Sequence, residues 1–521
     1  MGAVTIEAGT EADSRDDMTQ LRAKEQVAYV TGHFGSGAIL AAMTQLGSLQ
    51  VIIALSGMAR NKVAALYLQT DGIGEWSQIL GVATALFGIV QFGMVVGLSR
   101  NIASARDDKD RQRQLAVANS LTTLVAVIVM LAAFVLCATS SVDRILGAVG
   151  IPAKDKYLLL TLVLAVAPAE GLRNNYQSFL QGLLDVRGIA VTRGIAVTLA
   201  TLAAIPLVMM YGLVGVCAQL AVASALLSFL LGYRCYQRGY SPLQFQWNTT
   251  AAAGLATFGG ASLVISSANS FADVLIRSQL IHYSGLSQTG LYQAAFLVSS
   301  QVTLIVLGSI GVFSLASVSS SLEPRIISQQ LQAMYKVILP ISAISLSLLG
   351  LLERPVLELL FSSQFAAGSR FLPLLLVGNA VQAASWVAGA PLLGCGRVRA
   401  WLMLELSGAC IRYLIVIALL PPLGIQAIPL AFLLGQIFDI IGALIISSKS
   451  MKIPTSGTVL ARIGISSALP GGLALIGLYG TPGMFVAGAM VLAAGSVALA
   501  PLEASRLVSA SRIAIHRCVR L

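Results

Sequence analysis

Leu180-Gln-Gly-Leu-Leu-Asp-Val-Arg187 returns later in the chain, in a diverged form, as Leu392-Leu-Gly-Cys-Gly-Arg-Val-Arg399. The offset that matches Leu180 with Leu392 also places Gly212 on Gly424 without a gap. Repetition at one long offset indicates that a structural unit occurs twice. The sequence therefore predicts a chain built from two related halves.

The repeat extends toward the start of each half. At a slightly longer offset, Tyr67 matches Tyr283 and Gly74 matches Gly290, so a small loop insertion separates the two offsets. Each half contains six apolar runs, and an even number of membrane crossings gives both halves the same topology. We therefore expect a parallel repeat, as in many transporters.

The composition requires a membrane environment. Of 521 residues, 56% are apolar and only 11% are charged, against about 25% charged residues in an ordinary soluble domain. A bilayer accepts such a chain, because each spanning helix needs about 20 apolar residues. Fourteen apolar runs are long enough, at about 38–59, 78–99, 115–138, 157–179, 190–211, 213–233, 251–280, 290–318, 333–352, 369–392, 400–421, 424–447, 458–479 and 483–502.

These runs predict an all-α polytopic membrane protein of about 14 transmembrane helices. We expect a polar tail over residues 1–35, one six-helix lobe over 36–240 and a second over 241–450. Residues 451–521 would add two further helices and a basic tail. The first 35 residues lack the basic segment and cleavage site of a signal peptide, so we expect them to be retained.

Basic residues in alternate linkers predict the orientation. Cytoplasmic loops carry an excess of lysine and arginine. Alternate linkers are rich in these residues and the linkers between them are poorer, which fits fourteen helices with both termini in the cytoplasm. The densest basic cluster follows the second apolar run and contains Arg100, Arg106, Lys109, Arg111 and Arg113.

Several function classes find no support in the sequence. Six cysteines without a CxxC pair and three isolated histidines form no metal-ligand pattern. No phosphate-binding loop, HExxH motif or nucleophile–base arrangement is present, so we expect no metal, no other cofactor and no catalytic site. The net charge of +11 is explained by cytoplasmic loops and by anionic lipid or substrate, not by nucleic acid.

Charges within the apolar runs are the candidate functional residues, because a charge at bilayer depth is costly unless it faces protein or water. Arg60 and Lys62 end the helix that opens the first half, and Arg277 lies in the helix that opens the second. Cations from equivalent helices would converge in a cavity between the halves. Arginine grips a phosphate with two hydrogen bonds, and lysine adds a point charge. We therefore expect Arg60, Lys62 and Arg277 to bind pyrophosphate.

Other buried charges have alternative interpretations. Asp273 lies four residues from Arg277 and would either neutralise it or bind a coupling ion or proton, a role also open to Glu405. Structural or secondary cavity roles are predicted for Glu170, Arg173 and Arg412; Glu170 and Arg173 are three apart on one helical face, and Glu405 and Arg412 also share a face.

Short motifs resemble a known family. Lys62-Val-Ala-Ala-Leu-Tyr-Leu68 and Gly72-Ile-Gly-Glu-Trp-Ser-Gln78 are similar to the junction of the first two helices in bacterial polysaccharide flippases. Those are the O-antigen and lipid III flippases of the multidrug/oligosaccharidyl-lipid/polysaccharide exporter superfamily. Gly88-Ile-Val-Gln-Phe-Gly93 and Leu291-Tyr-Gln-Ala-Ala295 resemble later stretches. The family often has Gly-Pro before the paired glycines, where this chain has Thr70-Asp71.

The resemblance implies two lobes that form a V, alternating access across the bacterial inner membrane, and an undecaprenyl-pyrophosphate-linked oligosaccharide as cargo. It also places basic residues of the first and seventh helices near the pyrophosphate. Polysaccharide polymerase or export machinery would be the partner in O-antigen, exopolysaccharide or capsule biosynthesis. The alternatives are a cation-coupled multidrug antiporter of the same superfamily, a membrane polysaccharide polymerase or ligase, and a structural scaffold.

Overall fold

The computed structural model describes residues 36–91, 93–105, 107–139, 141–183, 185–308, 323–454, 457–479 and 488. Within these ranges every regular element is a helix. The predicted N-terminal tail, the run at 483–502 and the basic C-terminal tail lie outside the described residues.

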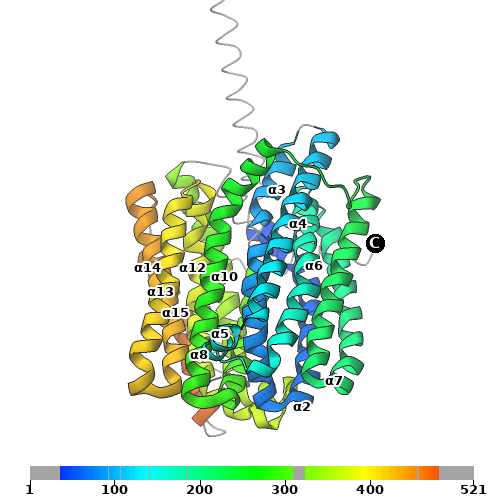
Figure 1. Cartoon of the computed structure of the whole chain (residues 1–521). Helices are drawn as coiled ribbons and strands as arrows, with labels where there is room; N and C mark the ends of the chain where they lie inside the picture. Colours follow the sequence, from blue (N-terminus) through cyan, green and yellow to red (C-terminus); the bar gives the residue numbers. More distant parts are fainter. Residues whose placement is uncertain are drawn as a thin grey trace, which may run out of the picture.

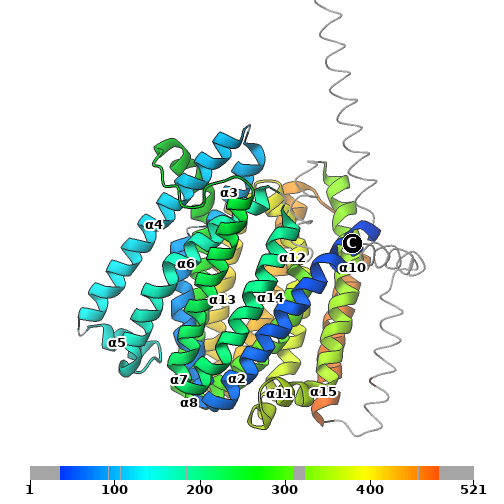
Figure 2. The same cartoon turned by 90° about the vertical axis from the view of Figure 1, so that its right-hand side faces the viewer.

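The helices form one bundle in which the long members lie roughly side by side (Figures 1 and 2). The first half of the chain supplies α2 (Ser36–Gln91), α3 (Met94–Ser104), α4 (Asp108–Ala138), α5 (Ser141–Ala148), η1 (Ala153–Asp155), α6 (Lys156–Gly182) and α7 (Val186–Gln237). The second half supplies α8 (Thr249–Gly308), α10 (Pro324–Leu351), α11 (Glu353–Leu360), η2 (Ser363–Phe371), α12 (Leu372–Gly394), α13 (Val398–Leu423), η3 (Gly424–Gln426), α14 (Ala427–Met451) and α15 (Gly457–Tyr479).

Seven helical segments of the described chain are long and apolar enough to cross a membrane. Some are far longer than one crossing: the 50 residues of Gly188–Gln237 would extend about 75 Å as a straight helix, against about 30 Å of bilayer hydrocarbon. They do not run straight. The helical backbone is interrupted at Gln69 in α2, Gly212 in α7 and Gly285 in α8, and each helix turns back there (Figure 1).

The turning points follow the repeat in the sequence. Gln69 and Gly285 are related by the offset that matches Gly74 with Gly290, and Gly212 is matched with Gly424, the residue that follows α13. All four have positive φ, with values of 57°, 82°, 54° and 58° respectively. Three are glycines, which adopt this conformation at no steric cost, whereas Gln69 adopts it as a strained non-glycine residue.

Helices α2 and α8 approach closely just beyond their turns. A Cβ atom on Gly74 would overlap the carbonyl oxygen of Leu286, and a Cβ atom on Gly290 would overlap that of Thr70. Thr70 and Leu286 are related by the same repeat offset as Gly74 and Gly290, so each half makes the same contact on the other. The Ser287 hydroxyl also donates a hydrogen bond of 3.0 Å to Thr70 Oγ1. Two glycines thus allow two backbones to touch.

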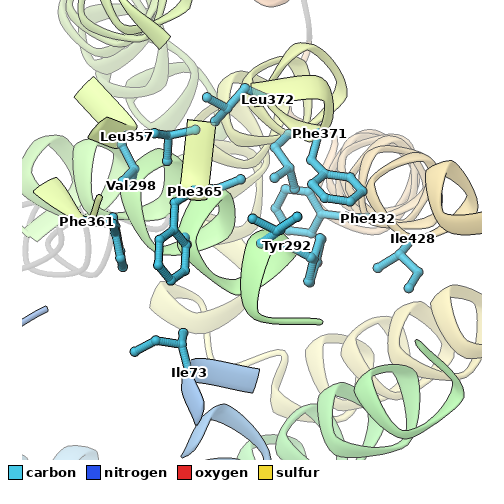
Figure 3. Packing of buried hydrophobic residues seen from close by; sticks show 14 of the residues in the cluster. Ile73, Tyr292, Val298, Leu357, Phe361, Phe365, Phe371, Leu372, Ile428 and Phe432 are labelled. Carbon is cyan, nitrogen blue, oxygen red and sulfur yellow. The ribbon is translucent and has the colours of Figure 1, made fainter. Parts of the chain in front are cut away.

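Apolar packing closes the bundle at the end where α2, α7 and α8 turn back, which we call the turn end. One buried cluster joins residues on either side of the turns, such as Ala65 and Ile73 of α2 and Leu280 of α8. Phe361, which directly follows α11, and Phe365 of η2 complete it (Figure 3). One separate cluster fills the space between α4, α6 and α7, and another fills the space between α10, α12 and α14.

We predict that Gly74→Ala destabilises the protein. The added methyl group meets the backbone of α8, which cannot move aside, and overpacking of this kind costs about 1–3 kcal/mol. The melting temperature of the purified protein in detergent should fall by several degrees. Gly254→Ala, in α8 with open space around its Cβ position, is the matched control and should not lower it. Equal melting temperatures for Gly74→Ala and the wild type would contradict the close contact.

Candidate functional site

Arg277 lies where the two halves meet. Its Nε donates a hydrogen bond of 3.3 Å to Oε1 of Gln78, in the part of α2 that follows the turn at Gln69. Gln78 is itself held to α8, because its Nε2 donates to the carbonyl oxygen of Val274 at 3.1 Å. The guanidinium fits against Gly81, where a Cβ atom would overlap its Nη2. Gly81 thus leaves room for a cation between α2 and α8.

The other two predicted pyrophosphate ligands lie in the part of α2 that precedes the turn at Gln69. Lys62 extends its amino group toward α11, where Nζ donates a hydrogen bond of 2.9 Å to the carbonyl oxygen of Glu358. Arg60 is partly buried, and its Nε has no hydrogen-bond partner within the described chain. Within the described chain, Lys62 and Arg277 share no hydrogen-bond partner, and no hydrogen bond links either of them to Arg60 through a common acceptor. Lys62 is tied to the turn end, while Arg277 bridges the halves.

A charged network connects α8 to α13. Arg412 forms an ion pair of 3.6 Å with Asp273, and its Nη2 donates a hydrogen bond to Oδ1 of Asn269. Asn269 in turn donates from Nδ2 to Oε2 of Glu405 at 3.3 Å. Asp273 thus makes its ion pair with Arg412, across to α13, and not with Arg277 on its own helix.

Asp439 of α14 adds a third carboxylate to this network. It lies close enough to Glu405 and Arg412 to interact with their charges, and its Oδ1 is buried without a hydrogen-bond partner in the described chain. Two glycines make room for the group: a Cβ on Gly408 would overlap Asp439, and one on Gly435 would overlap Arg412. Three carboxylates of α8, α13 and α14 thus lie in one network with Arg412, and the charge of Asp273 also acts on Arg277, one helical turn along α8. The carboxylates outnumber the two guanidiniums, an excess of negative charge that suits a proton or a small cation.

The first half contains a cluster of the opposite sign. Glu170 and Arg173 of α6 form an ion pair of 2.6 Å, and Ser224 of α7 donates a hydrogen bond of 2.7 Å to Glu170. Arg193 of α7 lies near enough to Arg173 for their charges to interact, and its Nε has no hydrogen-bond partner in the described chain. Here two guanidiniums share one carboxylate.

A pair of carboxyl groups lies near the turn of α2. Asp155, at the end of η1, is 8% exposed. Burial raises its pKa to about 6, with smaller contributions from a hydrogen bond to Glu75 and from the charge of that residue. Lys154 partly offsets the negative charge, because its Nζ lies 3.3 Å from Oε1 of Glu75. The Asp155 carboxyl is therefore protonated below about pH 6 and ionised above it.

Sequence reasoning missed the polar groups that organise these sites. Asn269 precedes Asp273 by four residues and so shares its helical face, a spacing that could have flagged it. Gln78 stands in the quoted family motif but carries no charge. The pairing of Glu75 with Asp155 joins segments that lie far apart in the sequence, and no local pattern indicates it.

Comparison with known proteins supports this architecture. No protein-family model matches the chain. The lipid III flippases of Escherichia coli K12 and Shigella flexneri are each 22% identical to it over 355 residues, which cover 68% of this chain and 84% of each flippase.

Two solved structures have the same fold. The lipid II flippase MurJ, in its inward closed conformation, aligns with a TM-score of 0.67 and 13% identity, covering 89% of this chain and all of that one. An inward-facing multidrug resistance transporter of the MATE family, from the MOP superfamily, aligns with a TM-score of 0.64 and 14% identity, covering 79% and 98%. The comparisons confirm the predicted resemblance at the level of that superfamily. The protein is a multi-pass membrane protein with the fold of these transporters.

We predict that Asp155 makes stability depend on pH. Its pKa in the folded protein, about 6, lies above its ordinary value, so the folded state holds the proton more tightly than the unfolded state. This contribution is therefore present at low pH and is lost as the pH rises through about 6. The wild-type melting temperature should fall between about pH 5 and about pH 7.5.

Asp155→Asn, which stays neutral, should flatten this dependence. Asp143→Asn is the control, because Asp143 forms a more exposed ion pair with Lys156 at 3.0 Å and should leave the slope between these pH values unchanged. An equal slope in Asp155→Asn and the wild type would contradict the raised pKa of Asp155.

Proposed function

We propose that this protein is a flippase that carries polyprenyl-pyrophosphate-linked oligosaccharides across the bacterial inner membrane. The similarity to lipid III flippases over two thirds of the chain is the observation that carries the proposal. The fold shared with another lipid flippase and with multidrug transporters supports it. These relatives are transporters, which supports a non-enzymatic protein and argues against a polymerase or ligase.

In the proposed architecture, fourteen helices form two six-helix lobes in a V, over residues 36–240 and 241–450, with two further helices after them. Both termini lie in the cytoplasm. The recurrence of turns at the repeat offsets and the reciprocal contact of Gly74 and Gly290 support this division. The turn end would then face outward, and its apolar cluster would close the outer side while the inner side receives substrate.

The pyrophosphate would bind to Arg60, Lys62 and Arg277. Arg277 supports this assignment best, because it bridges α2 and α8 and its guanidinium rests on a glycine. A phosphate bound there would contact both lobes, so its arrival could change the equilibrium between their arrangements. The lobes would then separate at the turn end and present the sugars outside. The lipid tail would stay in the bilayer throughout.

Asp273 and Glu405 would couple this cycle to a proton or another small cation. Together with Asp439 they give the second lobe an excess of carboxylates around Arg412. A bound cation would weaken the hold of these carboxylates on Arg412 and so loosen the link between α8 and α13. In this scheme Glu170 and Arg173 have a structural role, since they tie α6 to α7 through Ser224.

The second candidate function is cation-coupled export of drugs. The carboxylate-rich cluster and the fold shared with a multidrug resistance transporter favour it. The cations at the interface between α2 and α8 favour an anionic cargo. O-antigen, exopolysaccharide and capsule units all present the same pyrophosphate, and a polymerase or export complex would receive them.

We predict that Arg60→Ala and Arg277→Ala slow translocation about tenfold or more, because each removes charge-assisted hydrogen bonds to phosphate. The measurement is flipping of a fluorescent polyprenyl-pyrophosphate oligosaccharide in proteoliposomes. Arg144→Ala, an exposed arginine in α5, is the control and should keep the wild-type rate. Wild-type rates in both test variants would remove the proposed site. Transport of organic cations alone would favour the drug antiporter.

We also predict that Glu405→Gln and Asp439→Asn uncouple transport. Neither amide can ionise, so an imposed proton or sodium gradient should no longer accelerate flipping, while exchange without a gradient continues. Asp110→Asn, in the first turn of α4, should respond to the gradient as the wild type does. Full acceleration in both cluster variants would show that coupling resides elsewhere.

A further inference from the structure

The connection between α7 and α8 binds to the first half of the protein. We call residues 240–248 the strap; it crosses the ends of α3 and α4 in Figure 1. The side chain of Gln112 in α4 holds the backbone of Ser241: its Nε2 donates to the carbonyl oxygen and its Oε1 accepts from the N–H, each at 2.9 Å. The same Nε2 donates to Oε1 of Gln244 at 2.8 Å. Asn119 donates to the carbonyl oxygen of Pro242 at 2.8 Å.

Two tyrosines fix the start of the strap. The Tyr176 hydroxyl of α6 donates a hydrogen bond of 3.0 Å to the carbonyl oxygen of Pro242. Tyr240 donates to Asp108 at 2.7 Å and packs edge-on against Phe179, with ring centroids 4.8 Å apart. The strap is therefore fixed to α4 and α6 before α8 begins at Thr249.

Polar and apolar residues alternate along the strap. The backbone of the strap is bound to α4: the carbonyl oxygen of Gln244 accepts from Asn119 at 3.4 Å, and the backbone N–H of Gln246 donates to the carbonyl oxygen of Ala116 at 3.4 Å. Gln244 and Gln246 are themselves exposed, and the Asn248 side chain caps α8. The alternate positions carry apolar side chains that lie outside the buried clusters and are exposed: Leu243 by 70%, Phe245 by 50% and Trp247 by 57%.

The position of the strap along α4 indicates what covers these side chains. The exposed apolar face of α4 begins at Leu124, five residues beyond Asn119, or about 7.5 Å along the helix. The strap thus lies at the edge of the surface that faces lipid tails, where headgroups meet hydrocarbon. Tryptophan and tyrosine concentrate at this depth, and exposed Tyr233 and Tyr236 end α7 nearby.

Charge at this end suits the same partner. The segments 100–113 and 234–238 together contain seven basic and three acidic residues. Arg234 and Arg238 both pair with Asp185 at 2.9 Å, whereas Lys109 and Arg113 are exposed on α4. Basic residues beside an apolar surface attract anionic headgroups. We propose that Leu243, Phe245 and Trp247 insert into the headgroup layer of one leaflet, so that the strap anchors the first half of the protein at a fixed depth.

The anchor has a consequence that depends on the proposed function. If the halves rock against each other, the strap holds the first half at its depth together with the start of α8, where Ala252 and Leu255 pack against it, and the rest of the second half moves relative to them. The anchor itself needs only the membrane, so its test is separate from the transport assay.

Site-directed spin labelling tests the anchor. Single cysteines replace Leu243, Phe245 or Trp247 in a variant without the six native cysteines, and the labelled protein is reconstituted in vesicles of phosphatidylethanolamine and phosphatidylglycerol. All three labels should be several-fold more accessible to oxygen, relative to a water-soluble nickel chelate, than a label in Lys109→Cys, the aqueous control. Their accessibility ratio should remain below that of Phe134→Cys, which lies about 15 Å deeper on the exposed apolar face of α4.

Two outcomes would overturn the proposal. Labels that match the Lys109→Cys control would place the strap in water, and labels shielded from both reagents would show that protein covers it. If the cysteine-free variant does not fold, Trp247 serves as the probe after Trp76, Trp386 and Trp401 are replaced by phenylalanine. Brominated lipids should then quench its fluorescence, and the absence of quenching would exclude insertion.

Discussion

The contact between two glycines, Gly74 and Gly290, determines how the halves of this protein meet. Because neither residue has a side chain, the backbones of α2 and α8 touch, and the same contact is made twice through Thr70 and Leu286. Everything at the interface depends on this close approach. It places Gln78 within reach of Arg277, it gathers the apolar residues of the turn end into one cluster, and it aligns equivalent arms of the repeat.

The two halves share turns but differ in charge. In the first half, Arg173 and Arg193 outnumber Glu170, whereas in the second half three carboxylates outnumber Arg277 and Arg412. A duplicated scaffold has thus been given two different electrostatic environments, one suited to anions and one to cations. Arg277 belongs to the second of these environments, because the charge of Asp273 acts on it from one helical turn away.

Two of the turning residues, Gly212 and Gly424, are matched by the repeat in the sequence, because backbone reversals recur with a repeated unit. The turns at Gln69 and Gly285 obey the second offset, but the sequence analysis did not single these residues out. The partners of the charged residues were harder to predict. Asp273 of α8 pairs with Arg412 of α13, and Lys62 reaches the backbone of α11. Such pairings depend on how helices far apart in sequence pack, which periodicity and spacing do not determine.

Gln69 introduces an energetic difference between the two arms of the repeat. Its backbone has a φ of 57°, a conformation that costs a side-chain-bearing residue of order 1–3 kcal/mol, whereas Gly285 adopts its own turn freely. The packed turn end therefore stores conformational free energy on one side only. A rearrangement that unbends α2 would recover that free energy, which would partly offset the apolar contacts it breaks. The turn of α2 therefore opens at a lower cost in free energy than the turn of α8.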